Sequence, residues 1–170
     1  MGIEITRALW FAPRLFLAAA LTCVATACGA PGQVEGVVER QGFWVHDTAP
    51  ASRWSSDGRL VVMLSEDDGQ TLRVVSLQLL RAQELPEGKP IQIGPKDSGL
   101  PYLDVAQGEL EVSLRSDGAR ILSTKDTRYS RATRGTVEIR WLDGDLQGTF
   151  HVELDDGGYL DGSFLAPIER

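Results

Sequence analysis

The two histidines, His46 and His151, are the residues of this chain best suited to metal or acid–base chemistry. A metal site built on them would need the fold to bring both together with a carboxylate such as Asp47. His151 stands between Thr149 and Glu153, on the polar side of a segment in which apolar and polar residues alternate. We therefore expect His151 to be a surface residue rather than a metal ligand, unless His46 proves to adjoin it.

Three acidic turns offer oxygen ligands of the kind that calcium prefers. Each places carboxylates beside a glycine, and the candidate ligands are Asp67, Asp68, Asp143, Asp145, Asp155 and Asp156. No turn reproduces a complete calcium-binding loop, and Asp-Gly is also the ordinary composition of a hairpin turn. Hairpin turns are therefore the preferred interpretation, and no metal or other cofactor is predicted.

Trp44 and Trp54 are candidate ligand contacts, because an exposed tryptophan can stack on a sugar ring or anchor a protein partner. The alternative is that both cover the open end of a hydrophobic core. The motifs G-x-S-x-G, H-E-x-x-H, G-x-G-x-x-G and the Walker loop do not occur. No catalytic residue is predicted.

The first 27 residues have the features of an export signal. Arg7 and Arg14 precede an uncharged apolar run, Leu15–Ala27, that is too short to span a bilayer as a permanent helix. The run ends in the sequence Val-Ala-Thr-Ala-Cys at residues 24–28.

This ending resembles the lipobox of bacterial lipoproteins, although Ala25 stands where a lipobox usually has leucine. The resemblance implies cleavage after Ala27 and lipidation of Cys28, and hence a protein anchored in the cell envelope. Because Gly29 rather than aspartate follows the cysteine, it also implies the outer membrane if the host has one. The alternatives are an ordinary secretory signal cut after Ala25-Thr26-Ala27, which would give a secreted protein, and a retained anchor.

Cleavage before Cys28 would discard Cys23 and leave 143 residues, enough for one domain with a sizeable core. The mature domain would then contain neither a disulfide nor a thiolate metal site. Its formal charge would be −8 rather than −7, because the signal holds Arg7, Arg14 and Glu4. An acidic domain argues against nucleic acid as a partner and against a polybasic surface for lipid binding.

The pattern predicts three regions: a signal peptide at 1–27, a lipidated cysteine with a flexible tether at 28–40, and a β-sandwich domain at 41–170. Pro and Gly recur between β-rich runs, and no segment sustains a helical period. We therefore expect an all-β fold, a single antiparallel β-sandwich of about eight strands, with a small β-barrel as the alternative. Earlier strands are expected at 58–65, 71–80, 89–94, 108–114 and 119–124, with a short helix at 74–85 as an alternative.

The last strands can be aligned by hand, and they predict a meander at 134–142, 147–155 and 159–166. An Asp143-Gly144 turn pairs Trp141 with Leu146 and Val137 with Phe150, so that apolar residues face apolar residues.

A three-residue loop, Asp156-Gly157-Gly158, is then expected to pair Leu154 with Leu160 and Phe150 with Phe164. The same alignment sets two acids, Glu153 and Asp161, opposite each other on the polar face.

This meander contains a repeated G-x-F pair, Gly148-Thr149-Phe150 and Gly162-Ser163-Phe164. It resembles the closing strands of uncharacterised bacterial surface lipoproteins, which implies an extracytoplasmic β-sandwich and lends no catalytic residue. Three hypotheses follow. The first is a non-catalytic binding or structural module for another envelope protein or a glycan. The others are a calcium-stabilised adhesin-like domain and, last, an enzyme with an unrecognised site.

Overall fold

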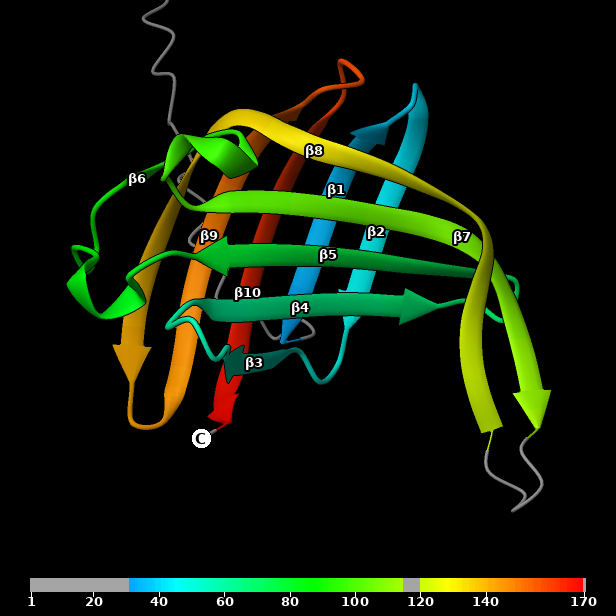
Figure 1. Ribbon diagram of the computed structural model, residues 1–170, viewed down its shortest axis with the longest axis horizontal. Coiled ribbons are helices and arrows are strands. Elements are labelled where there is room, and N and C mark those ends of the chain that lie inside the picture. Colours follow the sequence, from blue (N-terminus) through cyan, green and yellow to red (C-terminus); the bar gives the residue numbers. More distant parts are fainter. Residues whose placement is uncertain (1–30, 115–119, 170) are drawn as a thin grey trace, which may run out of the picture.

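The computed structural model describes residues 31–114 and 120–169, and these residues are all-β (Figure 1). The predicted signal peptide and Cys28 lie outside them. Two short 3-10 turns and no α-helix occur in the described ranges, so no helix there is long and apolar enough to cross a membrane. The strands are β1 Gly32–Val38, β2 Gln41–Asp47, β3 Ala51–Trp54, β4 Leu60–Asp67, β5 Thr71–Leu79, β6 Ile91–Ile93, β7 Tyr102–Leu114, β8 Arg120–Leu142, β9 Asp145–Leu154 and β10 Tyr159–Glu169, and the 3-10 turns are η1 Ala82–Glu84 and η2 Lys96–Ser98.

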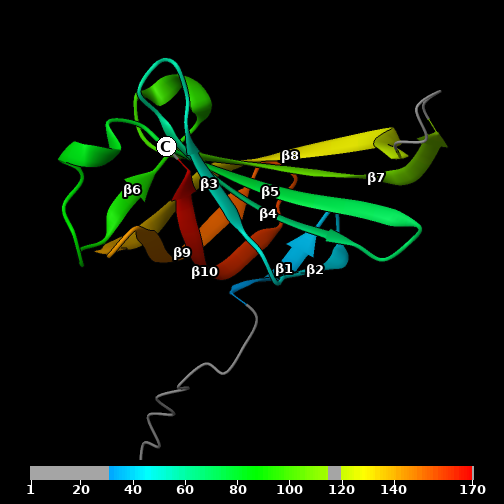
Figure 2. The same ribbon diagram turned by 90° about the horizontal axis from the view of Figure 1, so that it is seen from below.

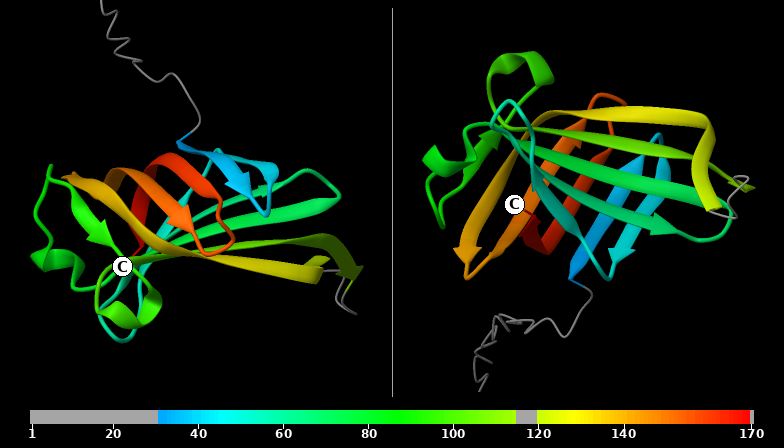
Figure 3. Two further views of the ribbon diagram at one scale, coloured as in Figure 1. Left: turned by 90° about the horizontal axis from the view of Figure 1, so that it is seen from above. Right: turned by 60° about the horizontal axis from the view of Figure 1, so that its bottom comes forward.

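All ten strands belong to one mixed sheet that bends into a partial ring. Layer A consists of β2, β1, β10, β9, the C-terminal part of β8 and β6, while layer B consists of β3, β4, β5, β7 and the N-terminal part of β8. The long strand β8 passes from one layer to the other (Figure 3). A short parallel pairing of β10 with β3, at Ile168↔Ser52 and Glu169↔Arg53, joins the layers on the opposite side.

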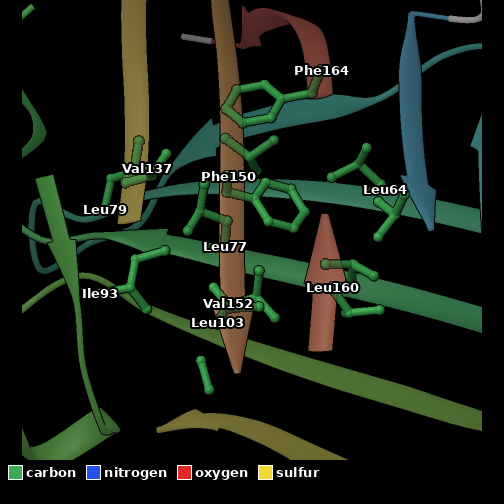
Figure 4. Close-up of a cluster of buried hydrophobic side chains, with 14 of the residues drawn as sticks. Leu64, Leu77, Leu79, Ile93, Leu103, Val137, Phe150, Val152, Leu160 and Phe164 are labelled. Carbon is green, nitrogen blue, oxygen red and sulfur yellow. The ribbon is translucent and has the colours of Figure 1, made fainter. Parts of the chain in front are cut away.

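The core lies between the two layers, which face each other in Figure 2. Alternate residues of each strand point into it, as the period of two requires. In β5, for example, Val75, Leu77 and Leu79 are fully buried while the residues between them are partly exposed. Figure 4 shows side chains from both layers meeting, among them Leu64, Leu77, Leu103, Val152, Leu160 and Phe164.

The all-β class and the first hairpin of the meander are confirmed. Trp141 pairs with Leu146 and Val137 with Phe150 around the two-residue Asp143-Gly144 turn. The predicted strand count and pairing were too simple, since residues 31–114 and 120–169 form ten strands and the β3–β10 pair is parallel. The alternative helix at 74–85 is wrong, because β5 continues to Leu79 and only η1 follows.

The predicted flexible tether at 28–40 is also wrong for most of its length. Residues 32–38 form β1, which is paired on both sides, with β2 and with β10. Val34 is fully buried in the core. The glycines of this segment suggested a flexible linker, but Gly32 lies against the side chains of Leu64 and Pro50 and Gly36 lies against the carbonyl of Tyr159, so neither position has room for a Cβ.

The second hairpin of the meander has a register two residues from the predicted one. Its loop is Asp155-Asp156-Gly157, with Gly157 at φ +82°, and Leu160 pairs with Val152 rather than with Leu154. Both registers bury the same apolar face, because a shift of two keeps every side chain on its own side.

The two G-x-F segments decide the register. They pair reciprocally, Gly148 with Phe164 and Gly162 with Phe150. Each ring lies over the opposite glycine, so a Cβ built on Gly148 or Gly162 would come within 2.4 or 2.3 Å of a ring carbon. The observed register is therefore the one in which each phenylalanine fills the space above a glycine.

Candidate functional site

The outward face of layer A is hollowed into a groove. One part of it has a volume of about 500 Å³ and a neighbouring part about 430 Å³, and Glu35 and Asp161 line both. We call this surface the outer groove. Its side chains come from β1, β2, β8, β9 and β10, and they are Gln33, Glu35, Trp44, Thr136, Glu138, Thr149, His151, Tyr159, Asp161 and Ser163.

Strand pairing places the central residues of the outer groove in rows that cross the sheet. One row runs from β2 to β6, and its members are Trp44, Glu35, Asp161, His151, Thr136 and Gln92. Six strands at the usual spacing make this row roughly 24 Å long. The next row contributes Gln33, Ser163, Thr149 and Glu138. The groove therefore presents hydroxyl, amide, imidazole and carboxylate groups at regular intervals.

His151 and Asp161 form a hydrogen-bonded pair in the middle of the outer groove. The distance from Nδ1 of His151 to Oδ1 of Asp161 is 2.7 Å. The predicted opposition of Glu153 and Asp161 is wrong, because the register shift sets Asp161 opposite His151 and Tyr159 opposite Glu153. Glu153 instead pairs with Arg134 at 2.7 Å. The shift replaces a repulsive pair with the attractive pair of His151 and Asp161, while Arg134 faces Glu153 through the β8–β9 register, which is as predicted.

A histidine oriented by a carboxylate is also the arrangement of a general base. Both side chains are more than half exposed, at 56% for His151 and 61% for Asp161, so water screens the pair. In the described part of the chain, no serine or threonine hydroxyl hydrogen-bonds to this imidazole. The pair is thus an exposed hydrogen bond on the floor of the outer groove.

Carboxylates outnumber cations along the outer groove. Glu35 stands directly opposite Asp161, and its carboxylate accepts a hydrogen bond from Gln33 at 2.7 Å. Glu138 is 3.5 Å from the guanidinium of Arg140 at the groove margin. Because like charges face each other across β1 and β10, this surface favours a ligand that donates hydrogen bonds or carries positive charge.

Trp44 forms one wall of the outer groove and is 44% exposed. The guanidinium carbon of Arg73 lies 4.5 Å from the centroid of its ring, and Arg73 is held in turn by Asp68 at 2.9 Å. This cation–π contact covers part of the indole and fixes its position. Tyr159, 47% exposed, lines the same part of the groove. Trp54, by contrast, is partly buried and packs against the core, as the alternative prediction had it.

The two histidines are not brought together. His46 lies on β2 opposite Gln33, and its nearest acidic partner is Glu66, 4.0 Å from Nδ1. Asp47 is buried and its carboxylate accepts the amides of Ala49 and Ser65. Within the described ranges, no three His, Cys, Asp or Glu side chains gather as metal ligands would.

Four of the six predicted calcium ligands, Asp67, Asp68, Asp155 and Asp156, already accept hydrogen bonds from backbone amides. Asp67 accepts the amide of Gly69, and Asp155 accepts the amide of Arg131. The amides of Thr71 and Gln70, with the Arg73 guanidinium, hold the pKa of Asp68 below its ordinary value. Asp143 and Asp145 lie at the β8–β9 turn, and Asp145 pairs with Leu142 and Pro167 in the sheet.

Asp156 ties three elements together. Its carboxylate accepts the Ser130 hydroxyl at 2.7 Å and the amides of Gly158 and Glu39 at 2.7 and 2.8 Å. Burial raises the pKa of Asp156, but these hydrogen bonds outweigh burial and leave the pKa below its ordinary value. The group is a structural acceptor joining the β9–β10 turn to β8 and to the β1–β2 turn.

Sequence reasoning found Trp44 and His151 but missed most of the outer groove. The alternation of Gln33 and Glu35 with buried neighbours was the available signal for β1, and the tether assignment obscured it. Asp161 was placed on the correct face with the wrong partner. A comparison of the chain with models of protein families, with curated proteins and with solved structures finds no match in any of the three.

Proposed function

We propose that this protein is a lipid-anchored module of the bacterial cell envelope that binds a glycan in the outer groove and carries out no catalysis. The single observation that supports glycan binding is the composition of the groove. Hydroxyl, amide and carboxylate groups line its floor, and exposed rings of Trp44 and Tyr159 stand at one end. Sugars present hydroxyls along their edges and apolar C–H faces, which match these two kinds of surface.

The charge of the outer groove narrows the ligand class. Glu35, Glu138 and Asp161 would repel an acidic polysaccharide. The ligand is therefore a neutral or amine-bearing oligosaccharide. Because the outer groove crosses most of layer A, the oligosaccharide that fills it contains several sugar units.

An array of neutral, amine-bearing and acidic oligosaccharides, probed with the soluble domain, tests this proposal. Wild type is expected to bind neutral or amine-bearing members and to lose at least tenfold in affinity on Asp161→Ala, because the carboxylate sits at the centre of the groove. Asp97→Ala, in the exposed turn η2, is the matched control and retains binding. Binding confined to acidic glycans, or equal loss in both variants, would refute the groove as the site.

The envelope location rests on the lipobox-like sequence that ends at Cys28, and Gly29 supports the outer membrane in a diderm host. A secreted form is the alternative. Because the two layers share one core, we propose that the fold is a β-sandwich rather than a small barrel. A calcium-stabilised adhesin-like domain is the less favoured function, because Asp67, Asp68 and Asp156 accept hydrogen bonds from amides of their own turns and Asp155 accepts one from β8.

A further inference from the structure

The start of β1 limits how far a lipid on Cys28 can lie from the folded domain. The amide of Leu165 donates a hydrogen bond to the carbonyl of Pro31 at 2.6 Å, so β10 holds the chain from Pro31 onward. Only Gly29 and Ala30 separate Pro31 from Cys28. Three residue steps span at most about 11 Å even when fully extended. The sequence pattern predicts a cysteine and tether at residues 28–40, whereas only residues 28–30 precede the point at which β10 holds the chain.

The end of the domain at which β1 begins has an exposed apolar surface. Leu142 is 45% exposed and Leu165 38% exposed, and the neighbouring Pro31 and Pro167 are exposed as well. The pairing of β8, β9 and β10 sets these residues on the outward face of layer A, in its last two rows. We call this surface the anchor end. It lies at the lower side of Figure 1, with the β8–β9 turn, the β2–β3 link and the C-terminal part of β10.

We propose that the anchor end rests on the phospholipid bilayer, with the strands of layer A rising from the membrane and the outer groove opening sideways above its surface. This inference rests on the lipidation of Cys28 proposed above. The occupant is the headgroup region of the bilayer, because the Cα atom of the lipidated Cys28 lies within about 11 Å of that of Pro31. Asp143, Asp145 and Glu169 lie at the same end, so the contact does not depend on anionic lipid.

Two positions on β2 allow a matched test. Thr48 directly follows the end of β2 beside the start of β1, and Gln41 is the first residue of the same strand; both are exposed. They are separated by seven residue steps, roughly 23 Å along the strand. The lipidated protein carries no other free cysteine, so Thr48→Cys and Gln41→Cys can each take a single fluorophore.

Each labelled, lipidated protein is reconstituted in phosphatidylcholine vesicles that contain a phospholipid with a nitroxide headgroup. Quenching is expected to be at least twofold stronger at position 48 than at position 41. Equal quenching, or stronger quenching at position 41, would overturn the orientation.

An insertion of ten Gly and Ser residues between Ala30 and Pro31 is the companion variant. Such a linker adds a mean span of about 17 Å, so the difference between positions 48 and 41 should shrink towards zero. A difference that persists unchanged would contradict the role of tether length. Intact mass of the same samples separates the two claims: an acylated protein without a 48/41 difference refutes the orientation alone, whereas an unacylated protein refutes the anchor and, with it, the orientation.

Discussion

At the scale of single residues, two glycines of β9 and β10 decide how these strands pair. Gly148 and Gly162 each lie beneath a phenylalanine ring of the neighbouring strand. The alternation of apolar residues predicted the buried face correctly and the register incorrectly, because both registers satisfy alternation. The two registers differ in how the side-chain volumes fit together, and a pattern of polar and apolar residues does not show side-chain volume.

Gly162→Ala should destabilise the protein by about 1–3 kcal/mol, because the added methyl group would overlap the ring of Phe150. Gly42→Ala is the matched control, since a Cβ at this exposed strand position meets nothing within 4 Å. The control should change the free energy of unfolding by no more than about 0.5 kcal/mol. Urea denaturation of both variants measures the difference, and similar effects would contradict the stacking of Phe150 on Gly162.

Asp156 gives a prediction for the pH dependence of stability. Its pKa is lowered from 3.8 in the folded protein, so the stability it contributes is present above that value and is lost as the pH falls through the lowered pKa. Asp156→Asn should cost about 1–3 kcal/mol at pH 7, since hydrogen bonds to a charged acceptor are weakened.

Urea midpoints measured between pH 7 and pH 2 check this expectation. The wild-type and Asp156→Asn curves should converge as the pH falls, because the wild type alone loses the charged acceptor. Curves that stay parallel over the whole range would show that the carboxylate contributes nothing through its charge.

At the scale of elements, the sequence predicts the long, strongly alternating strands and misses the short or small-residue ones. β5 and the hairpin of β8 with β9 were found because apolar and polar residues alternate beside Asp-Gly turns, and β4 because a continuous apolar run precedes such a turn. β1 alternates only around Gln33 and Glu35 and contains two glycines, and β3 has four residues, so both patterns are weak. The parallel β3–β10 pair joins segments more than a hundred residues apart, which local patterns cannot predict.

That junction depends on a buried serine. Ser52 in β3 is fully buried, and its hydroxyl donates a hydrogen bond to the carbonyl of Pro167 at 2.6 Å. Ser52→Ala should cost about 1–3 kcal/mol, because the carbonyl loses its partner in a buried place.

Ser65→Ala, at an exposed position of the adjacent strand β4, should stay within about 0.5 kcal/mol of wild type. Thermal unfolding compares the two variants, and hydrogen exchange should quicken in β3 and the end of β10 only for Ser52→Ala. Unchanged stability of the Ser52→Ala variant would show that this hydrogen bond does not stabilise the junction of β3 with β10.

At the scale of the whole molecule, the anchor end and the outer groove lie on the same layer of the sheet. Layer A carries both the anchor end, where the chain enters β1, and the outer groove, which lies farther along the same strands. The candidate site could be foreseen only in part, because its central row of residues is assembled from six strands whose order depends on the pairing of β1 with β10. Trp44 and His151 were identifiable as single residues, whereas their alignment with Glu35 and Asp161 required the register.

The proposed lipidation of Cys28 predicts the mass of the mature protein. Its intact mass, taken from the membrane fraction, should correspond to a chain that begins at Cys28 and carries acyl groups, while Cys28→Ala should be unprocessed or soluble. An unmodified chain starting at residue 28 would mean an ordinary secretory signal and a free secreted domain.

The most direct test of the account maps the ligand onto the surface. Soluble domain with Cys28→Ala, labelled with ¹⁵N, is titrated with a neutral or amine-bearing oligosaccharide selected on the array, and backbone amide shifts are followed by NMR. We expect the amide shifts to change on layer A around Glu35, His151 and Asp161. The amide shifts on the outward face of layer B, at Val74 and Tyr129, should stay unchanged. Shifts that gather on layer B, or binding without any change in the outer groove, would contradict this expectation.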